Sequence, residues 1–185
     1  DRDLELQTFH LAETLDGDWR ALADEAKRVL DGFQGRLGIH GPFWGFTVDS
    51  LDPEIRAVVT RRMLQGLDVC AATGASLMVI HSPFSQWSRQ NIPNIPGARE
   101  KLTEMVHLTL APVVKRAEEQ GVVLAMENIQ DVDPADRRML CESFGSPAIR
   151  LSVDTGHAQL AHVTNAAPPV DYFIRDAGAA LAHVH

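Results

Sequence analysis

Six side chains of the kinds that bind metal ions recur along this chain, most of them at the end of a short apolar run. They are His40, His81, Glu127, Asp154, His157 and His185. Buried imidazoles and carboxylates that converge from several strands repel one another and lose solvation unless a cation neutralises them. A lone histidine at a strand end is more often structural, and a lone buried glutamate could pair with an arginine. The set of six together predicts a metal site.

The ligand types also restrict the metal. Imidazole and carboxylate ligands together suit Mn, Zn, Co or Fe better than Ca or Mg alone. We expect a divalent metal cofactor, with Mn, Zn, Co and Mg as the candidates. The sequence leaves open which ion binds and how many ions there are.

The elements that must position these residues alternate along the chain. Short apolar runs indicate buried parallel strands, and segments of helical periodicity separate them. The predicted strands are 3–9, 36–40, 76–82, 122–127, 149–155 and 181–185, and the predicted helices are 18–33, 52–74, 98–120, 134–144 and 170–178. This alternation is typical of a parallel α/β protein.

Two parallel layouts compete, a doubly wound sheet and a (β/α)₈ TIM barrel. No Gly-rich phosphate loop follows the first strand, and candidate site residues end at least five strands, which favours the barrel. A complete barrel has eight strands and typically about 250 residues. We therefore expect the 185 residues to form a single domain (1–185) of about six βα units, which lacks the first and last strands of the barrel.

Composition excludes some classes of protein. The net charge of −8 and the pI near 5.4 argue against a nucleic-acid partner. Cys70 and Cys141 lie in helix-like segments without CxxC spacing, so we expect reduced, buried thiols in a cytoplasmic protein. No membrane span or signal peptide is recognisable. Unpaired edges of an incomplete sheet invite association, so a homo-oligomer remains an open outcome.

Two long segments follow predicted strands on the side of the candidate site. Residues 41–50 contain Trp44 and Phe46, and residues 83–97 contain Trp87 and Arg89. Loops of this length without secondary structure are usually functional or disordered. The aromatic side chains could stack on a sugar ring, with Arg89 as a further substrate-binding residue. They could equally seal the rim of the barrel.

The strand ends also carry a family resemblance. The segments GIHGPF, MVIHSPF, VVLAMEN, LSVDTGHA and LAHVH resemble, in this order, successive strand ends of the xylose-isomerase-like TIM-barrel superfamily. That superfamily includes sugar isomerases and epimerases, inosose dehydratases and the endonuclease IV type of DNA-repair enzyme. The most specific part is VDTGHA followed by a strand that ends in HVH.

The resemblance implies roles for the six residues. Glu127, Asp154 and His185 match the ligands of a single divalent metal in the sugar epimerases, whose further Glu ligand from the last strand has no equivalent in this chain. His157 matches a histidine that contacts substrate in the epimerases and binds metal in the endonuclease type. His40 and His81 match two more metal-binding histidines of the endonuclease type, which holds three zinc ions.

The expected chemistry is isomerisation or epimerisation of a sugar or sugar phosphate by proton transfer beside a carbonyl that the metal polarises. Glu127 is the candidate base, and His157 is the second candidate catalytic residue. One alternative is a zinc phosphodiesterase of the endonuclease IV type. A further alternative is a non-catalytic sugar-binding barrel.

Other polar residues are expected outside the metal site. We predict that His183 points away from the barrel interior and is structural, and that His10 and His162 are surface residues in loops. His107 is predicted on a helix surface. Glu5 could line the pocket or form a salt bridge, and Asn128 could orient Glu127.

Overall fold

Six parallel strands, hydrogen-bonded in the order β1-β2-β3-β4-β5-β6, form one curved sheet in the computed structural model, which describes residues 3–185. The strands are β1 (Leu4–Leu6), β2 (Leu37–His40), β3 (Leu77–His81), β4 (Val123–Glu127), β5 (Ile149–Val153) and β6 (Leu181–Val184). Sequential order with parallel pairing throughout is the arrangement of a TIM barrel. The predicted fold class, six βα units of such a barrel, is confirmed.

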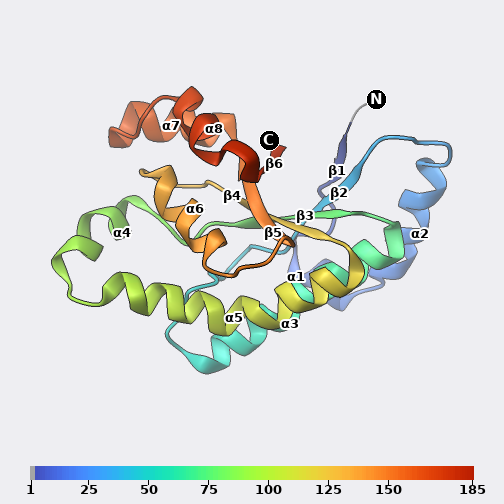
Figure 1. Ribbon diagram of the computed structural model, residues 1–185. Coiled ribbons are helices and arrows are strands. Elements are labelled where there is room, and N and C mark those ends of the chain that lie inside the picture. The colour runs from blue at the N-terminus through green and yellow to red at the C-terminus, as the bar shows by residue number, and fades with distance from the viewer. Residues whose placement is uncertain (1–2) are drawn as a thin grey trace.

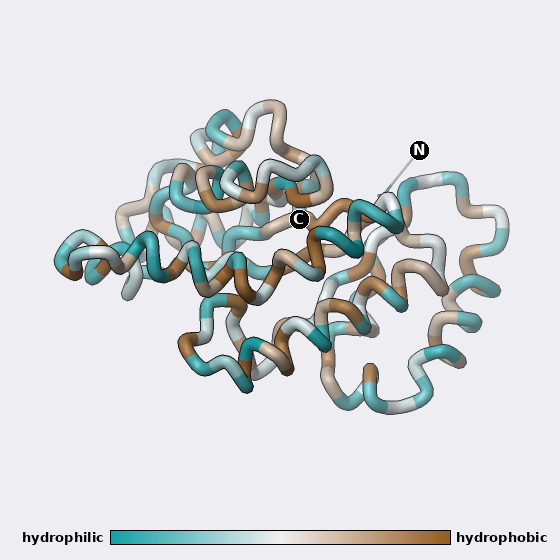
Figure 2. Tube along the Cα trace, turned by 60° about the horizontal axis from the view of Figure 1, so that its bottom comes forward, coloured by the Kyte–Doolittle hydropathy of each residue, from teal (hydrophilic) through white to brown (hydrophobic). Residues whose placement is uncertain are grey.

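The helices connect successive strands. They are α1 (Ala12–Asp16), α2 (Trp19–Val29), α3 (Pro53–Thr73), α4 (Gln86–Asn91), the 3₁₀ helix η1 (Ile92–Asn94), α5 (Ala98–Gln120), α6 (Pro134–Glu142), α7 (Thr155–Asn165), α8 (Val170–Ala177) and the 3₁₀ helix η2 (Gly178–Ala180). The long helices α3 and α5 run side by side along the sheet (Figure 1). Along the helices, hydrophilic and hydrophobic residues alternate (Figure 2), as expected for elements with one face on a core.

Helix boundaries follow from capping residues. The carboxylate of Asp52 accepts hydrogen bonds from the backbone amides of Glu54 and Ile55, and Pro53 occupies the first turn, so α3 begins there. The helix ends at Gly74, whose φ of 80° lies in the left-handed region that glycine adopts without strain. The predicted helices 52–74 and 98–120 are therefore matched closely.

Two predictions of irregular structure were wrong, and one short helix was not predicted. The segment 83–97 contains α4 and η1, because Ser85 and Ser88 form a reciprocal capping box that starts a helix. Residues 155–165 form α7, which places His162 on a helix instead of in a loop. Short helix α1 precedes α2. These helices are short or rich in small residues, so they have little of the apolar periodicity on which the prediction depended.

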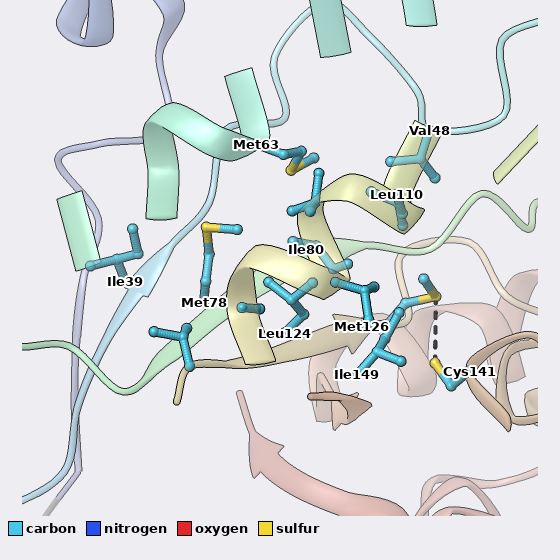
Figure 3. Close-up of a cluster of buried hydrophobic side chains, with 14 of the residues drawn as sticks. Ile39, Val48, Met63, Met78, Ile80, Leu110, Leu124, Met126, Cys141 and Ile149 are labelled. Atoms are coloured by element: carbon cyan, nitrogen blue, oxygen red, sulfur yellow. Dashed lines mark hydrogen bonds between the residues drawn. The ribbon is translucent and has the colours of Figure 1, made fainter. Parts of the chain in front are cut away.

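The core lies between the sheet and the helices. Met78 and Ile80 of β3 and Leu124 and Met126 of β4 are at most 1% exposed and pack against α3 and α5 (Figure 3). Cys141 of α6 contacts Met126, with 3.8 Å between the two sulfur atoms. Both cysteines are buried free thiols, as predicted.

The two outer strands approach each other across the concave side of the sheet. Arg36, just before β2, donates from Nη1 to the carbonyl oxygen of Ala182 in β6 at 2.9 Å and pairs with Asp3. His183 of β6 lies 3.3 Å from the carboxylate of Glu5 in β1. The strands thus surround an interior space. Among residues 3–185, no helix combines the length and apolarity needed to cross a membrane.

Candidate metal centre

The two-residue period of the strands decides which side chains enter the interior. In β3 and β4 the residues Met78, Ile80, Leu124 and Met126 belong to the helix-facing core, while Leu77, Val79 and Ala125 form a separate small cluster. Because side chains alternate between the two faces, His81 and Glu127 share the interior face with this second cluster. The same parity turns His40 and Asp154 inward, since Ile39 and Val153 are in the helix-facing core.

Glu127, Asp154 and His185 meet at the carboxyl ends of β4, β5 and β6. Nδ1 of His185 lies 2.6 Å from Oε1 of Glu127 and 3.6 Å from Oδ2 of Asp154. One ligand atom from each residue lies within 4.8 Å of the other two. Two carboxylates and an imidazole at this spacing fit a divalent cation such as zinc or manganese.

His40 and His81 bring a second set of donors to the same carboxylate. Their Nε2 atoms are 3.3 Å apart, and each lies 3.7 Å from Oε2 of Glu127. Glu127 is therefore shared, with Oε1 toward His185 and Oε2 toward the two histidines. These three residues also form a group whose ligand atoms lie within 4.8 Å of one another.

The tautomer of His40 follows from its hydrogen bond. Its Nδ1 lies 2.9 Å from the carbonyl oxygen of Gly41, which can only accept, so Nδ1 carries the proton. In a neutral ring the lone pair would then be on Nε2 and available to a metal ion, whereas a protonated ring would direct an N–H group toward Glu127. A backbone carbonyl that fixes a histidine in this way is a common feature of metal sites.

Burial and the surrounding histidines control ionisation at the centre. Burial alone would raise the pKa of Glu127, but His40 and His185 hold it at about 2, so this carboxylate is ionised at neutral pH. Burial, together with His40, lowers the pKa of His81 to about 4 and leaves it neutral. Burial opposes protonation of His185 as well, yet the hydrogen bond to Glu127 raises its pKa above the ordinary value.

The carboxylate of Asp154 makes two contacts, and the turn that follows it leaves room for both. Its Oδ1 accepts a hydrogen bond of 2.6 Å from the backbone amide of His157 and so caps α7, leaving Oδ2 near His185. A Cβ on Gly156 would lie 3.2 Å from Oδ1, so glycine at this position leaves room for the carboxylate. His157 itself lies in the first turn of α7, with Nε2 3.9 Å from Asp154 and a 40% exposed side chain.

Aromatic rings that the sequence analysis did not predict pack against His40 and His81. Phe43 stacks on His81 with ring centroids 4.2 Å apart, and it also contacts His40 and His10. His10 was expected to be a surface residue. It is instead half-buried, with its ring 6.4 Å from that of His40. In the sequence, only the segment GIHGPF, which places Phe43 three residues after His40, could have indicated these ring contacts.

The four residues predicted to bind substrate lie at different depths. Trp44 and Trp87 are 61% and 68% exposed, and the ring of Trp44 lies 5.2 Å from that of Phe43. Phe46 packs against the core, and exposed Arg89 pairs with Asp133 at 3.6 Å. Within residues 3–185, neither Trp87 nor Arg89 makes a hydrogen bond, an ion pair or a ring contact with the candidate metal ligands.

Two cavities border the centre. One of about 450 Å³ lies between β1 and β6 and is lined by Glu5, His183 and His185, among others. The other, of about 190 Å³, is lined by His81, Phe43 and Phe46 and by further polar and apolar residues, among them Met63 of α3. The candidate ligands thus lie between a larger interior cavity and a smaller one beneath the loops that follow β2 and β3.

The prediction for His183 was wrong. His183 is two residues before His185, so strand alternation places both on the same face. Its Nδ1 lies 2.9 Å from the hydroxyl of Ser152, and its Nε2 lies 3.3 Å from Glu5. Glu5 both lines the interior cavity and pairs with His183. His107, which stacks on Phe144, and exposed His162 lie outside the centre.

Comparisons with known proteins agree with this arrangement. Residues 3–185 match the family model described as xylose isomerase-like TIM barrel. A D-tagatose 3-epimerase-like protein superposes with a TM-score of 0.77 at 17% identity, over 99% of this chain and 66% of its own. A zinc-soaked protein from Thermus thermophilus is 30% identical over 85% of this chain and 58% of its own, with a TM-score of 0.61. A 3-keto-D-glucoside 4-epimerase from E. coli is 18% identical, with a TM-score of 0.67, over 99% of this chain and 77% of its own.

None of the curated proteins matches the chain in sequence. The chain covers less than two thirds of the first two of these structures. The match of the family model over residues 3–185, together with the six parallel strands, identifies this chain as a member of the xylose isomerase-like TIM-barrel family.

Proposed function

We propose that this protein is a metal-dependent isomerase or epimerase of a sugar or sugar phosphate. The observation that carries the proposal is the convergence of Glu127, Asp154 and His185 at three adjacent strand ends, with ligand atoms within 4.8 Å of one another. Epimerases are also named among the proteins of similar fold, which supports a carbohydrate substrate. A bound divalent ion would act as a Lewis acid toward the carbonyl of that substrate.

Residues of this chain would transfer the proton and hold the substrate. Glu127 is 1% exposed and ionised at neutral pH, so it could accept a proton from the carbon beside the carbonyl without competition from bulk water. His157 stands at the entrance, with a 40% exposed side chain, where it could hold a substrate hydroxyl. Phe43, which stacks on His81, and the neighbouring ring of Trp44 offer apolar faces on which a sugar ring could stack.

Replacement of the base tests this assignment. We expect Glu127→Gln to abolish turnover while metal remains bound, because the amide keeps an oxygen ligand but cannot accept the proton. Turnover and deuterium uptake from solvent beside the carbonyl would be followed with a panel of ketoses, aldoses and their phosphates, and bound metal would be quantified by elemental analysis.

Glu142→Gln is the matched control, since Glu142 is exposed on α6 and pairs only with Arg138 among its recorded salt bridges within residues 3–185. It should retain full activity. Unchanged turnover in Glu127→Gln would refute the role of Glu127 as base.

A zinc phosphodiesterase is the second candidate, because His40 and His81 add nitrogen donors 3.3 Å apart beside the shared carboxylate. The net charge of −8 opposes a nucleic-acid substrate. One ion per chain with sugar turnover would support the epimerase. Several ions, lost on His40→Ala or His81→Ala, together with nicking of abasic DNA, would support the phosphodiesterase.

A further inference from the structure

A buried arginine joins the two strands that carry the candidate carboxylate ligands. Arg137 lies on α6 and is 1% exposed, and its Nη1 donates to the carbonyl oxygen of Met126 at 2.9 Å and to that of Ser152. Met126 directly precedes Glu127 in β4, and Ser152 is two residues before Asp154 at the end of β5. One guanidinium group therefore holds the two strands at the point where their ligands emerge.

The charge of this arginine is balanced by an equally buried carboxylate. Asp131 is 1% exposed, and its Oδ1 lies 3.3 Å from Nε of Arg137. It also accepts hydrogen bonds from the hydroxyl of Ser82 at 2.9 Å and from the amide of Ile129. Because Ser82 directly follows His81, the network extends to the end of β3.

Asn128 closes the network behind the centre. Its side-chain amide donates to the carbonyl oxygen of Asp154, and its side-chain oxygen accepts from the amide of Asp154, both at 2.9 Å. The same oxygen lies 3.4 Å from Nη1 of Arg137. Asn128 was expected to orient Glu127, but it fixes the backbone of Asp154 instead.

General energetics suggest a role for this network other than stability. A buried ion pair is often no more stabilising than apolar residues of the same size, because desolvation offsets the attraction. Groups behind metal ligands, by contrast, orient those ligands and raise metal affinity. Within residues 3–185, every side-chain hydrogen bond of Arg137 goes to a strand end or to Asn128, which itself fixes Asp154.

We propose that Arg137, neutralised by Asp131, is a positioning residue that sets the distance between Glu127 and Asp154 and thereby the metal affinity of the centre. The inference rests on the proposed metal-dependent function. It requires that removal of the pair weakens metal binding even where the fold is intact.

The test compares two double variants that each remove both charges of an arginine–aspartate pair, so that no buried charge remains uncompensated. Arg137→Met with Asp131→Asn removes the network. The control is Arg62→Met with Asp16→Asn, since Arg62 is 8% exposed and binds Asp16 of α1 through Nη2 at 2.7 Å, joining α1 to α3. Cobalt affinity would be measured by competition with a chromophoric chelator, and the unfolding midpoint would be measured in urea with metal removed.

We expect the Arg137 double variant to lose about 10- to 100-fold in cobalt affinity, with near-normal circular dichroism. The Arg62 double variant should bind cobalt as tightly as the wild type, whatever its unfolding midpoint. If the first variant does not fold, Asn128→Ala, which removes the two bonds to Asp154 and the contact with Nη1 of Arg137, must show the loss of affinity instead.

Equal cobalt affinity in the wild type and in the folded Arg137 or Asn128 variant would overturn the positioning role. A wild type that binds no divalent metal would refute the proposed function itself, so the two failures are distinguishable.

Discussion

At the scale of single residues, Gly156 leaves room for the carboxylate of the candidate ligand Asp154. Asp154 caps α7 through Oδ1 and turns Oδ2 to His185, and a side chain at position 156 would come within 3.2 Å of Oδ1. Real Cβ atoms rarely come so close to a neighbour, so the carboxylate would have to shift by a few tenths of an ångström. In the DTGH segment, one aspartate therefore serves both as a helix cap and as a candidate metal ligand.

Gly156→Ala should therefore weaken metal binding several-fold while leaving the metal-free fold as stable or more stable. Gly156 lies in the first turn of α7, so the gain from alanine should be smaller than the about 0.8–1.0 kcal/mol of a helix interior, and the two effects have opposite signs. Zinc affinity and urea unfolding of the chelated protein would be measured together. Gln159→Ala, exposed on the same helix, is the control. Loss of stability without loss of affinity would contradict this explanation.

At the scale of elements, the strands differ in how firmly they are held. β3 and β4 each pair with two neighbours, and Met78, Ile80, Leu124 and Met126 are at most 1% exposed. β1 and β6 each pair with one neighbour within residues 3–185, and Leu4 and Val184 are 39% and 53% exposed. The end of β6 that carries the candidate ligand His185 is thus less firmly held than the corresponding ends of β3 and β4.

Native-state hydrogen exchange should reproduce this order. We expect the slowest exchange at 78–80 and 124–126 and faster exchange at 4–6 and 181–184, because opening of an outer strand exposes less buried surface than opening of a central one. Mass spectrometry of peptides would resolve these segments. Protection of β6 equal to that of β4 in the metal-free protein would show that this ranking is wrong.

At the scale of the whole molecule, the pair formed by Glu127 and His185 ties β4 to β6 and makes stability depend on pH. Against the effect of burial, His40 and then His185 lower the pKa of Glu127 from 4.5 to about 2, so the contribution of this carboxylate is complete above about 4.5 and is lost as the pH falls toward 2. The pKa of His185 rises above 6.5, so its contribution is complete below 6.5 and is lost at higher pH.

The pair should therefore stabilise the metal-free protein most between pH 4.5 and 6.5. We expect the difference in free energy of unfolding between the wild type and His185→Gln to be largest in this window and to shrink on both sides. Urea titrations with a chelator present would measure it. His162→Gln, exposed on α7, should give a difference without this maximum. A wild-type advantage that grew steadily toward alkaline pH would contradict the assigned signs.

The local sequence was enough to predict all six strands and the long helices, because burial on both faces leaves continuous apolar runs and because Asp52-Pro53, Gly74 and Gly121 mark helix ends. It also selected Glu127, Asp154, His185, His40 and His81, since residues that end parallel strands must meet at one edge. Strand alternation alone turns His183 inward beside His185, so the sequence contained the information needed to place this residue correctly.

Only the tertiary structure determines the contacts between segments that lie far apart in the chain. Three such contacts depend on the curvature of the sheet and on the placement of the helices. Glu127 contacts His185 on one side and His40 and His81 on the other, Phe43 stacks on His81, and Arg137 bonds to β4 and β5. A local pattern fixes which face a side chain occupies, but it does not contain the distances between strands that pack together only after folding.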